Sequence, residues 1–367
     1  MVAVSLRTEH SPYWRLAAIG TAALLLLTLA APVAARNPNG QNTYTVTVLQ
    51  SNQTDSSLVN GWGITAGPPS TPTPWWVSDN GMNVSTLYNG AGTKIGLTVS
   101  VAGGPTGTVF NLAGSGFNVT SSGGTTASAR FLFATEGGQV MGWFPGITGN
   151  VAEPGFTATD GAVYKGLAIG MDSAGWHLYA TDFHNGKVDV FDSAFALHPD
   201  TSKFVDPGIP AGFAPFGIQN LNGHIFVTYG KQDDPADAHD EVDGGGLGFV
   251  DMFGTDGSFQ GRVFSRGMLN APWGLAWAPS GFGKFSGDLL VGNFGNGRIN
   301  AFAPTPGGWV AAGPVKGADH RPIAIDGLWG IGFGNGGASG PLTTLYFAAG
   351  PAGESEGLFG SITPPAS

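Results

Sequence analysis

Four polar side chains each end an apolar run, and their oxygen atoms are suited to hold a hard cation. Asp79, Asp182 and Asn293 each close such a run, and Glu136 closes another. Carboxylate and amide oxygens are the ligands that Ca²⁺ and Mg²⁺ prefer, so the first three are candidate metal ligands. An ion held there would polarise a carbonyl group or activate a water, with Glu136 assisting. The same residue types also cap tight turns, and both interpretations stay open.

His184 is the candidate general base. It follows Asp182 by two residues, so in an extended chain both side chains face the same side. A carboxylate nearby would support proton transfer by the imidazole. The sequence His184-Asn-Gly is equally typical of a hairpin turn that carries a solvated histidine.

Aromatic residues form the candidate ligand-binding set. Four of them open apolar runs, and a fifth closes one: Trp62, Phe216, Trp273, Trp329 and Tyr229. Flat rings around a shared opening would bind a sugar or another cyclic ligand. Large aromatics at equivalent positions of a repeat also pack between neighbouring units, which is the alternative interpretation.

The segment 231–243 holds six carboxylates and one histidine. It interrupts the repeat pattern described below, and long insertions of this kind often carry function. It is a candidate lid or Ca²⁺-binding loop. A solvated acidic loop is the alternative, since that is the usual role of a run of like charges.

A repeated pattern of short apolar segments must position these residues. Each unit has a strand that opens around a glycine, a second strand that ends in a polar residue, and a third that ends in an aromatic. The anchor glycines are 44 to 59 residues apart, a spacing typical of one β-propeller blade with variable loops. They are Gly63, Gly107, Gly166, Gly217, Gly274 and Gly330.

The repeats predict an all-β, six-bladed propeller, with a pair of packed sheets as the alternative. The last unit has only three strands, and the unassigned strand 44–49 would complete it and close the ring. In such a blade the inner strand begins where the second strand ends, so the polar residues should gather at one mouth of the central channel. The expected blades span 57–98, 103–148, 162–205, 213–264, 270–312 and 326–364.

Composition limits the functions that this chain can perform. Of 367 residues 62 are Gly, only 11% are charged and none is Cys, which excludes disulfides and thiolate metal sites. The net charge of −10 argues against nucleic-acid binding. Two arginines, the apolar run 16–31 and the small residues 33–35 are typical of a secretory signal peptide. We therefore expect cleavage after residue 35 and a secreted or periplasmic domain, 36–367, that is monomeric and not inserted in a membrane.

Several runs resemble a known family. They are Tyr164-Lys-Gly-Leu-Ala168, Ala180-Thr-Asp-Phe-His-Asn-Gly-Lys187, the long run from Trp273 to Phe302, and Gly357-Leu-Phe-Gly-Ser-Ile-Thr-Pro364. Together they resemble an uncharacterised family of secreted bacterial six-bladed propeller proteins, with an architecture like that of the lactonases, over about residues 42 to 364. The resemblance implies a secreted propeller and no established activity.

Two functional hypotheses follow from the sequence. In the first, the propeller presents one mouth of its channel to a small molecule, a glycan or an extracellular protein, without catalysis. In the second, a divalent ion at that mouth serves a hydrolase or lyase, with Asp79, Asp182 and Asn293 as ligands and His184 as base. Ca²⁺ or Mg²⁺ is the expected cofactor only in the second.

Overall fold

The computed structural model describes residues 41–233 and 237–365. These residues belong to one compact unit, Ala34–Ser367. The predicted signal peptide, residues 1–35, lies outside the described residues. Among the residues that are described, no helix is long and apolar enough to cross a bilayer.

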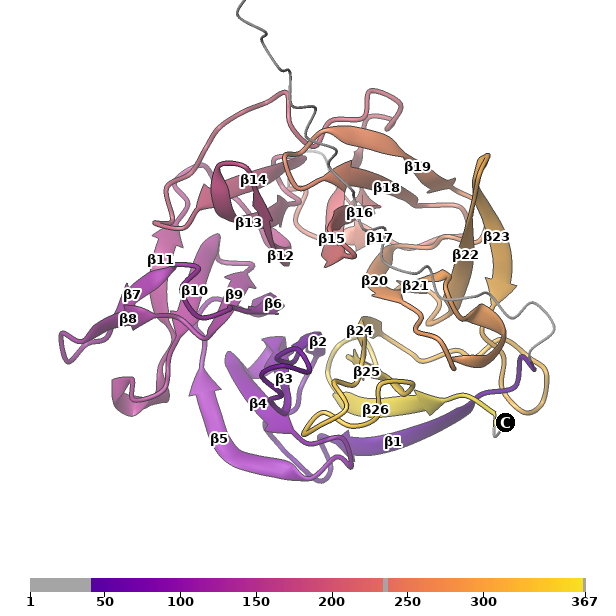
Figure 1. Cartoon of the computed structure of the whole chain (residues 1–367), viewed down its shortest axis with the longest axis horizontal. Coiled ribbons are helices and arrows are strands. Elements are labelled where there is room, and N and C mark those ends of the chain that lie inside the picture. Colours follow the sequence, from indigo (N-terminus) through magenta and orange to yellow (C-terminus); the bar gives the residue numbers. More distant parts are fainter. Residues whose placement is uncertain (1–40, 234–236, 366–367) are drawn as a thin grey trace, which may run out of the picture. The chain divides into compact units, whose positions relative to one another are not determined.

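Six antiparallel sheets are arranged around a central axis, which confirms the predicted six-bladed propeller (Figure 1). From the axis outward, the first blade is β2 (Gly61–Thr65), β3 (Trp75–Asp79), β4 (Val84–Tyr88) and β5 (Lys94–Ser100). The second is β6 (Pro105–Phe110), β9 (Phe131–Thr135), β10 (Gln139–Trp143) and β11 (Glu153–Thr157). The third is β12 (Tyr164–Asp172), β13 (Gly175–Asp182) and β14 (Lys187–Asp192).

The remaining three blades follow the same order. The fourth is β15 (Phe213–Leu221), β16 (His224–Gln232), β18 (Phe249–Gly254) and β19 (Phe259–Ser265). The fifth is β20 (Pro272–Trp277), β21 (Leu289–Asn293), β22 (Ile299–Thr305) and β23 (Gly308–Pro314). The sixth is β24 (Leu328–Phe333), β25 (Leu345–Ala349), β26 (Leu358–Thr363) and β1 (Thr45–Ser51).

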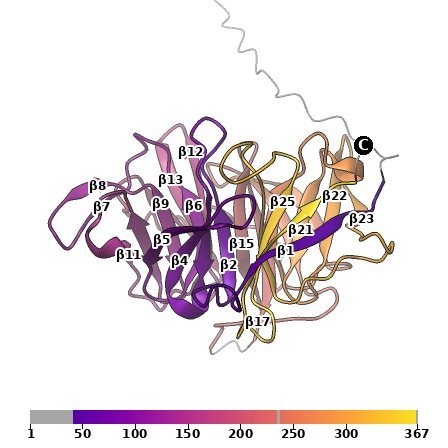
Figure 2. The same cartoon turned by 90° about the horizontal axis from the view of Figure 1, so that it is seen from below.

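A few short elements lie outside the blade pattern. The hairpin β7 (Asn118–Thr120) and β8 (Thr126–Ser128) is inserted in the second blade, and β17 (Glu241–Val242) pairs with β16. Three short 3-10 helices are η1 (Asn80–Met82), η2 (Thr148–Asn150) and η3 (Gly283–Phe285). Figure 2 shows β17 at one face of the ring, and Figure 1 shows it near the axis.

The N-terminal strand closes the ring, as predicted from the unassigned strand. β1 pairs antiparallel with β26, from Thr45 opposite Thr363 to Ser51 opposite Leu358. The first and last parts of the described chain therefore share one blade, which covers an edge that β26 would otherwise leave open.

The anchor glycines allow the inner strands to pack closely. A Cβ on Gly166 would lie 2.9 Å from the carbonyl oxygen of Phe216, and one on Gly274 would lie 2.6 Å from that of Trp329. The contact continues around the ring, since a Cβ on Gly330 would lie 2.6 Å from the carbonyl oxygen of Trp62. Adjacent inner strands approach each other too closely at these points for a side chain.

Candidate functional site

The strand pairings place the predicted polar residues at one end of the blades. Gly61 pairs with Asp79, Tyr164 with Asp182, and Pro272 with Asn293, so the second strands end where the inner strands begin. We call this end of the channel the polar mouth.

The three predicted metal ligands each bond within or next to their own blade. Asp79 Oδ2 accepts the backbone N–H of Thr86 (2.9 Å), and Asp182 Oδ2 accepts from Asn185 Nδ2 (2.8 Å). Asn293 donates from Nδ2 to the carbonyl oxygen of Met268 (2.8 Å). All three side chains are buried, and burial raises the pKa of Asp79 and Asp182. These contacts stabilise turns and strands, whereas Asp79 Oδ1 and Asn293 Oδ1 are buried and have no hydrogen-bond partner among the described residues, so the metal-ligand assignment stays a prediction.

His184 lies at the polar mouth, but it bonds to a different partner from the one expected. Its Nδ1 lies 2.7 Å from the carbonyl oxygen of Asp237, and since a carbonyl oxygen can only accept, Nδ1 is the donor. Asp182 bonds to Asn185 instead. This hydrogen bond of His184 therefore connects the segment 231–243, which we call the acidic segment, to the third blade.

The predicted ligand-binding aromatics are buried, and four of them fill the channel. Trp62 and Trp329 stack with ring centroids 3.7 Å apart, and the Trp273 ring meets both edge-on. Phe216 contacts Trp329 in the same cluster. The rings cover one another rather than surround an open mouth, and they form a plug across the axis.

Tyr229 lies away from this plug. It is 3% exposed and packs in a cluster formed by the third and fourth blades, with Tyr179 and Phe204. Burial raises the pKa of Tyr229, with the nearby Asp251 carboxylate adding to the effect. The structure gives this residue a packing role between blades.

A buried lysine forms the centre of the polar mouth. Lys165, on β12, has a side chain that is only 1% exposed, and its Nζ lies 2.6 Å from Glu136 Oε1 and 3.1 Å from Asp240 Oδ1. The ammonium group also lies 5.1 Å from the centroid of the Trp62 ring, on the aromatic plug. Its backbone carbonyl accepts from Trp273 Nε1 (2.9 Å), which fixes the strand to the same plug.

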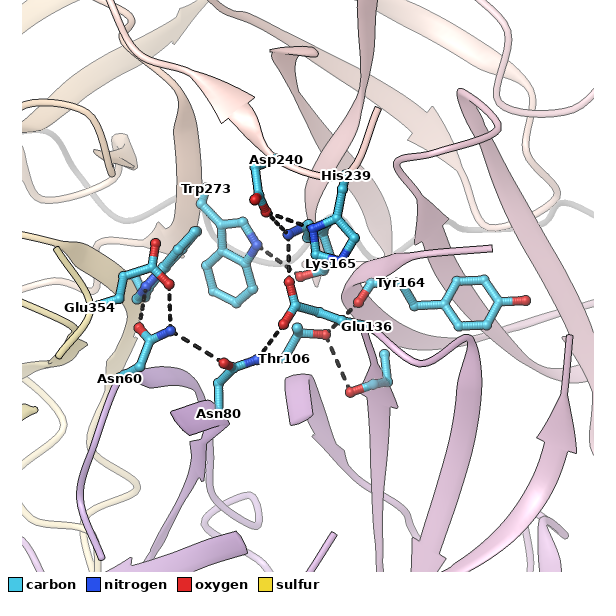
Figure 3. A network of polar contacts seen from close by, with 12 residues as sticks. Asn60, Asn80, Thr106, Glu136, Tyr164, Lys165, His239, Asp240, Trp273 and Glu354 are labelled. Atoms are coloured by element: carbon cyan, nitrogen blue, oxygen red, sulfur yellow. Dashed lines mark hydrogen bonds and ion pairs between the residues drawn. The ribbon is translucent and has the colours of Figure 1, made fainter. Parts of the chain in front are cut away.

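A chain of hydrogen bonds extends from this lysine across three more blades (Figure 3). Asn80 Nδ2 donates to Glu136 Oε2 (2.8 Å), and Asn60 Nδ2 donates to Asn80 Oδ1 (3.3 Å) and to Glu354 Oε2 (2.6 Å). Asn60 has φ +48°, a left-handed conformation that asparagine tolerates better than most residues. Its Oδ1 accepts from Trp329 Nε1 (3.0 Å), which joins the network to the plug.

Negative charge exceeds positive charge around Lys165. Burial alone would lower the pKa of Lys165, but the charges of Glu136, Glu241 and Asp240 outweigh burial and raise it, so it stays an ammonium. Burial raises the pKa of Glu241 to about 7, and it also raises the pKa of Glu354. Asp240 keeps a lowered pKa because Lys165 and His239 offset its burial. Four carboxylates thus face one lysine, a setting that attracts a cation.

The structure also brings together one group with metal-ligand chemistry. Among the described residues, ligand atoms of Glu136, His239 and Asp240 lie within 4.8 Å of one another. His239 Nδ1 is 2.8 Å from Asp240 Oδ1, and Lys165 already contacts both carboxylates. An ion bound here would therefore use the remaining carboxylate oxygens or displace the ammonium group.

The repeat pattern of the sequence contains one signal for this centre. The residue before each anchor glycine is aromatic in four blades, Thr106 in the second and Lys165 in the third. A lone charge at an otherwise uncharged repeat position marks a specialised residue. No repeat position indicates the role of Asn60, Glu241 or Glu354, because their partners come from distant parts of the chain.

The fold and this site define a six-bladed β-propeller with a charged network at one mouth. Two uncharacterised proteins of Acanthamoeba polyphaga mimivirus are similar in sequence. Protein R648 is 33% identical over 301 residues, covering 77% of this chain and 70% of its own. Protein L690 is 31% identical over 334 residues, covering 84% and 81%. The chain belongs to the same family as these two viral proteins, and no protein-family model matches it.

Two solved structures show the same fold. A putative gluconolactonase superposes with a TM-score of 0.53 at 16% identity, covering 90% of this chain and 97% of its own. The soluble aldose sugar dehydrogenase of Escherichia coli gives 0.53 at 14% identity, covering 88% and 100%. At such low identity these likenesses concern the fold alone.

Proposed function

We propose that this protein is an exported binding propeller that holds a small, positively charged organic ligand at the polar mouth. The surplus of carboxylates around Lys165 supports the proposal most strongly. Glu136, the adjacent pair Asp240 and Glu241, and Glu354 come from three separate segments, and among the described residues Lys165 is the one lysine that opposes them. A ligand ammonium group would relieve the mutual repulsion that this arrangement maintains.

The access to these carboxylates supports the same proposal. The Asp240 side chain is 64% exposed and that of Glu136 is 20% exposed, whereas Lys165 is buried beneath them. A ligand would thus meet acidic oxygens first, above a floor formed by the aromatic plug. Rings beneath a cation site add to its attraction for positive charge.

A divalent-metal-dependent hydrolase or lyase is the second candidate. The proximity of Glu136, His239 and Asp240 favours it, since these three offer two carboxylates and an imidazole. A metal held by them would supply Lewis-acid chemistry at the mouth.

Thermal shift separates the two candidates. We expect 1,4-diaminobutane to raise the melting temperature of the wild type and to have a much smaller effect on Glu136→Gln. The matched control is Glu153→Gln, a carboxylate on β11 in the second blade, which should respond like the wild type. A response to Ca²⁺, Mg²⁺ or Mn²⁺ that is reversed by chelator, without a response to the diamine, would favour the metal candidate. No response to any cation would refute both.

A further inference from the structure

The opposite mouth of the channel is hollow and lined by uncharged residues. Two adjoining pockets of about 350 and about 280 Å³ share Thr65, Ala66, Pro68 and Gln219 at the far ends of the inner strands. They lead to a narrow space of about 20 Å³, ringed by aliphatic residues such as Leu167, Leu275 and Ile331. We call these three spaces together the apolar funnel. The larger pocket has the size of a small-molecule site.

The aromatic plug separates the apolar funnel from the polar mouth. Trp273 lines the narrow end of the funnel, while its Nε1 donates to the carbonyl oxygen of Lys165 on the other side. Trp62 and Trp329 are buried beside it. A molecule in the funnel therefore cannot reach the carboxylates around Lys165, so the two mouths are independent sites.

The lining of the funnel defines the chemistry of an occupant. Phe110, Trp176, Trp277 and Phe333 supply aromatic walls, and none of the residues that line the three spaces carries a formal charge. An ion entering the funnel would lose its hydration without gaining an opposite charge. The lining therefore selects a neutral ligand.

One amide in the funnel is available for a hydrogen bond. Gln219 borders all three spaces, and within the described part of the chain its side chain has no hydrogen-bond partner. The other two amides are already used: Asn335 Nδ2 donates to the carbonyl oxygen of Gly67 (2.9 Å), and Asn220 Nδ2 to that of Ile169 (2.9 Å). We propose that the apolar funnel binds a neutral, largely apolar small molecule whose single polar group bonds to Gln219.

The test uses a neutral fluorescent probe, N-phenyl-1-naphthylamine, whose emission rises in apolar sites. We expect saturable binding to the wild type and loss of binding in Ala66→Trp, which fills the entrance. The matched control is Ala91→Trp, the same change at an exposed turn in the first blade, and it should bind the probe like the wild type. A melting curve for each variant establishes that the fold is retained.

Competition then examines the chemistry of the ligand. We expect 1-octanol to displace the probe at concentrations at least about tenfold lower than octanoate, because the carboxylate would be buried without a partner. Gln219→Leu should weaken displacement by 1-octanol about fivefold, the effect of one lost hydrogen bond. Equal displacement by octanoate, unchanged binding in a folded Ala66→Trp, or an unaltered octanol response in Gln219→Leu would each overturn the proposal.

Discussion

Lys165 is the one charged residue among the six that precede the anchor glycines. It remains an ammonium although it is buried, because carboxylates from two other segments lie within 3.1 Å of it. The charge is not compensated within its own blade: Glu136 follows β9 of the second blade, and Asp240 precedes β17. A single residue thus connects the aromatic plug to the acidic segment.

Replacing this lysine should destabilise the fold. In Lys165→Met the carboxylates lose the buried counter-charge that the described residues provide, but Glu136 and Asp240 remain partly hydrated. We therefore expect a loss of about 1–3 kcal/mol of unfolding free energy, measured by denaturant titration. The control is Lys203→Met, a partly exposed lysine that forms no ion pair with the described residues, and it should cost less than about 1 kcal/mol. Equal losses in the two variants would contradict the central role of Lys165.

The raised pKa of Glu241 predicts a specific dependence of stability on pH. Its pKa is about 7 in the folded protein against an ordinary 4.5, so the folded state binds the proton more tightly than the unfolded state does. Stability from this group is therefore present below pH 4.5 and is lost as pH rises to 7. Glu241→Gln should match the wild type near pH 4 and melt at least about 2 °C higher at pH 8. A difference that is the same at both pH values would refute this assignment.

At the scale of the elements, the inner strands are defined by their glycines. Each anchor glycine faces the backbone of the next blade, and the contacts continue around the ring. Because these contacts involve backbone atoms, no side-chain rearrangement can relieve them. The spacing of the glycines therefore reports the number of blades as well as the position of each inner strand.

A matched pair of glycine substitutions tests this packing. Gly217→Ala would place a Cβ against the carbonyl group of Trp273, far inside van der Waals contact, and should cost about 2 kcal/mol or more of unfolding free energy. Gly96→Ala, in the outer strand β5, has no atom within 4 Å of the added methyl group and should be neutral or slightly stabilising. The two free energies, compared by urea denaturation, should differ clearly. Equal values would show that blade contacts do not require glycine.

The strands and the closing strand could be predicted from local patterns, because strand alternation and turn residues lie close together in the sequence. The contacts of the site could not. Asp79 and Asn293 stand at the correct end of their blades, yet their hydrogen bonds are made to Thr86 and Met268. The order of the strands predicts at which end of a blade a polar residue lies, but not whether its side chain caps a turn or binds a metal. The Lys165 network joins residues up to 294 positions apart in sequence, so only the closed ring brings them together.

At the scale of the whole molecule, the ring depends on one strand from the other end of the chain. β1 supplies the outer edge of the last blade, so deleting residues 41–51 should leave the outer edge of β26 unpaired and lower the melting temperature. A synthetic peptide of residues 41–52, added in excess, should restore much of the loss by mass action, whereas a scrambled peptide should not. An unchanged melting temperature in the deletion variant would mean that ring closure contributes little.

The two mouths of the channel differ in chemistry although the same six strands build both. One end gathers carboxylates around a buried lysine, and the other is uncharged and partly aromatic. The aromatic plug isolates them, so each can bind its own class of ligand. Substitutions at one mouth should leave binding at the other unaltered.

Isothermal titration of a cation into the polar mouth tests the central claim most directly. At pH 7 in two buffers with different ionisation enthalpies, binding of 1,4-diaminobutane should release a fraction of a proton, because a ligand cation lowers the pKa of Glu241 and Glu354. The release should fall in Glu241→Gln, and binding should weaken strongly in Glu136→Gln. Binding without proton release, or equal affinity in wild type and Glu136→Gln, would contradict the claim that surplus carboxylates around Lys165 form the site.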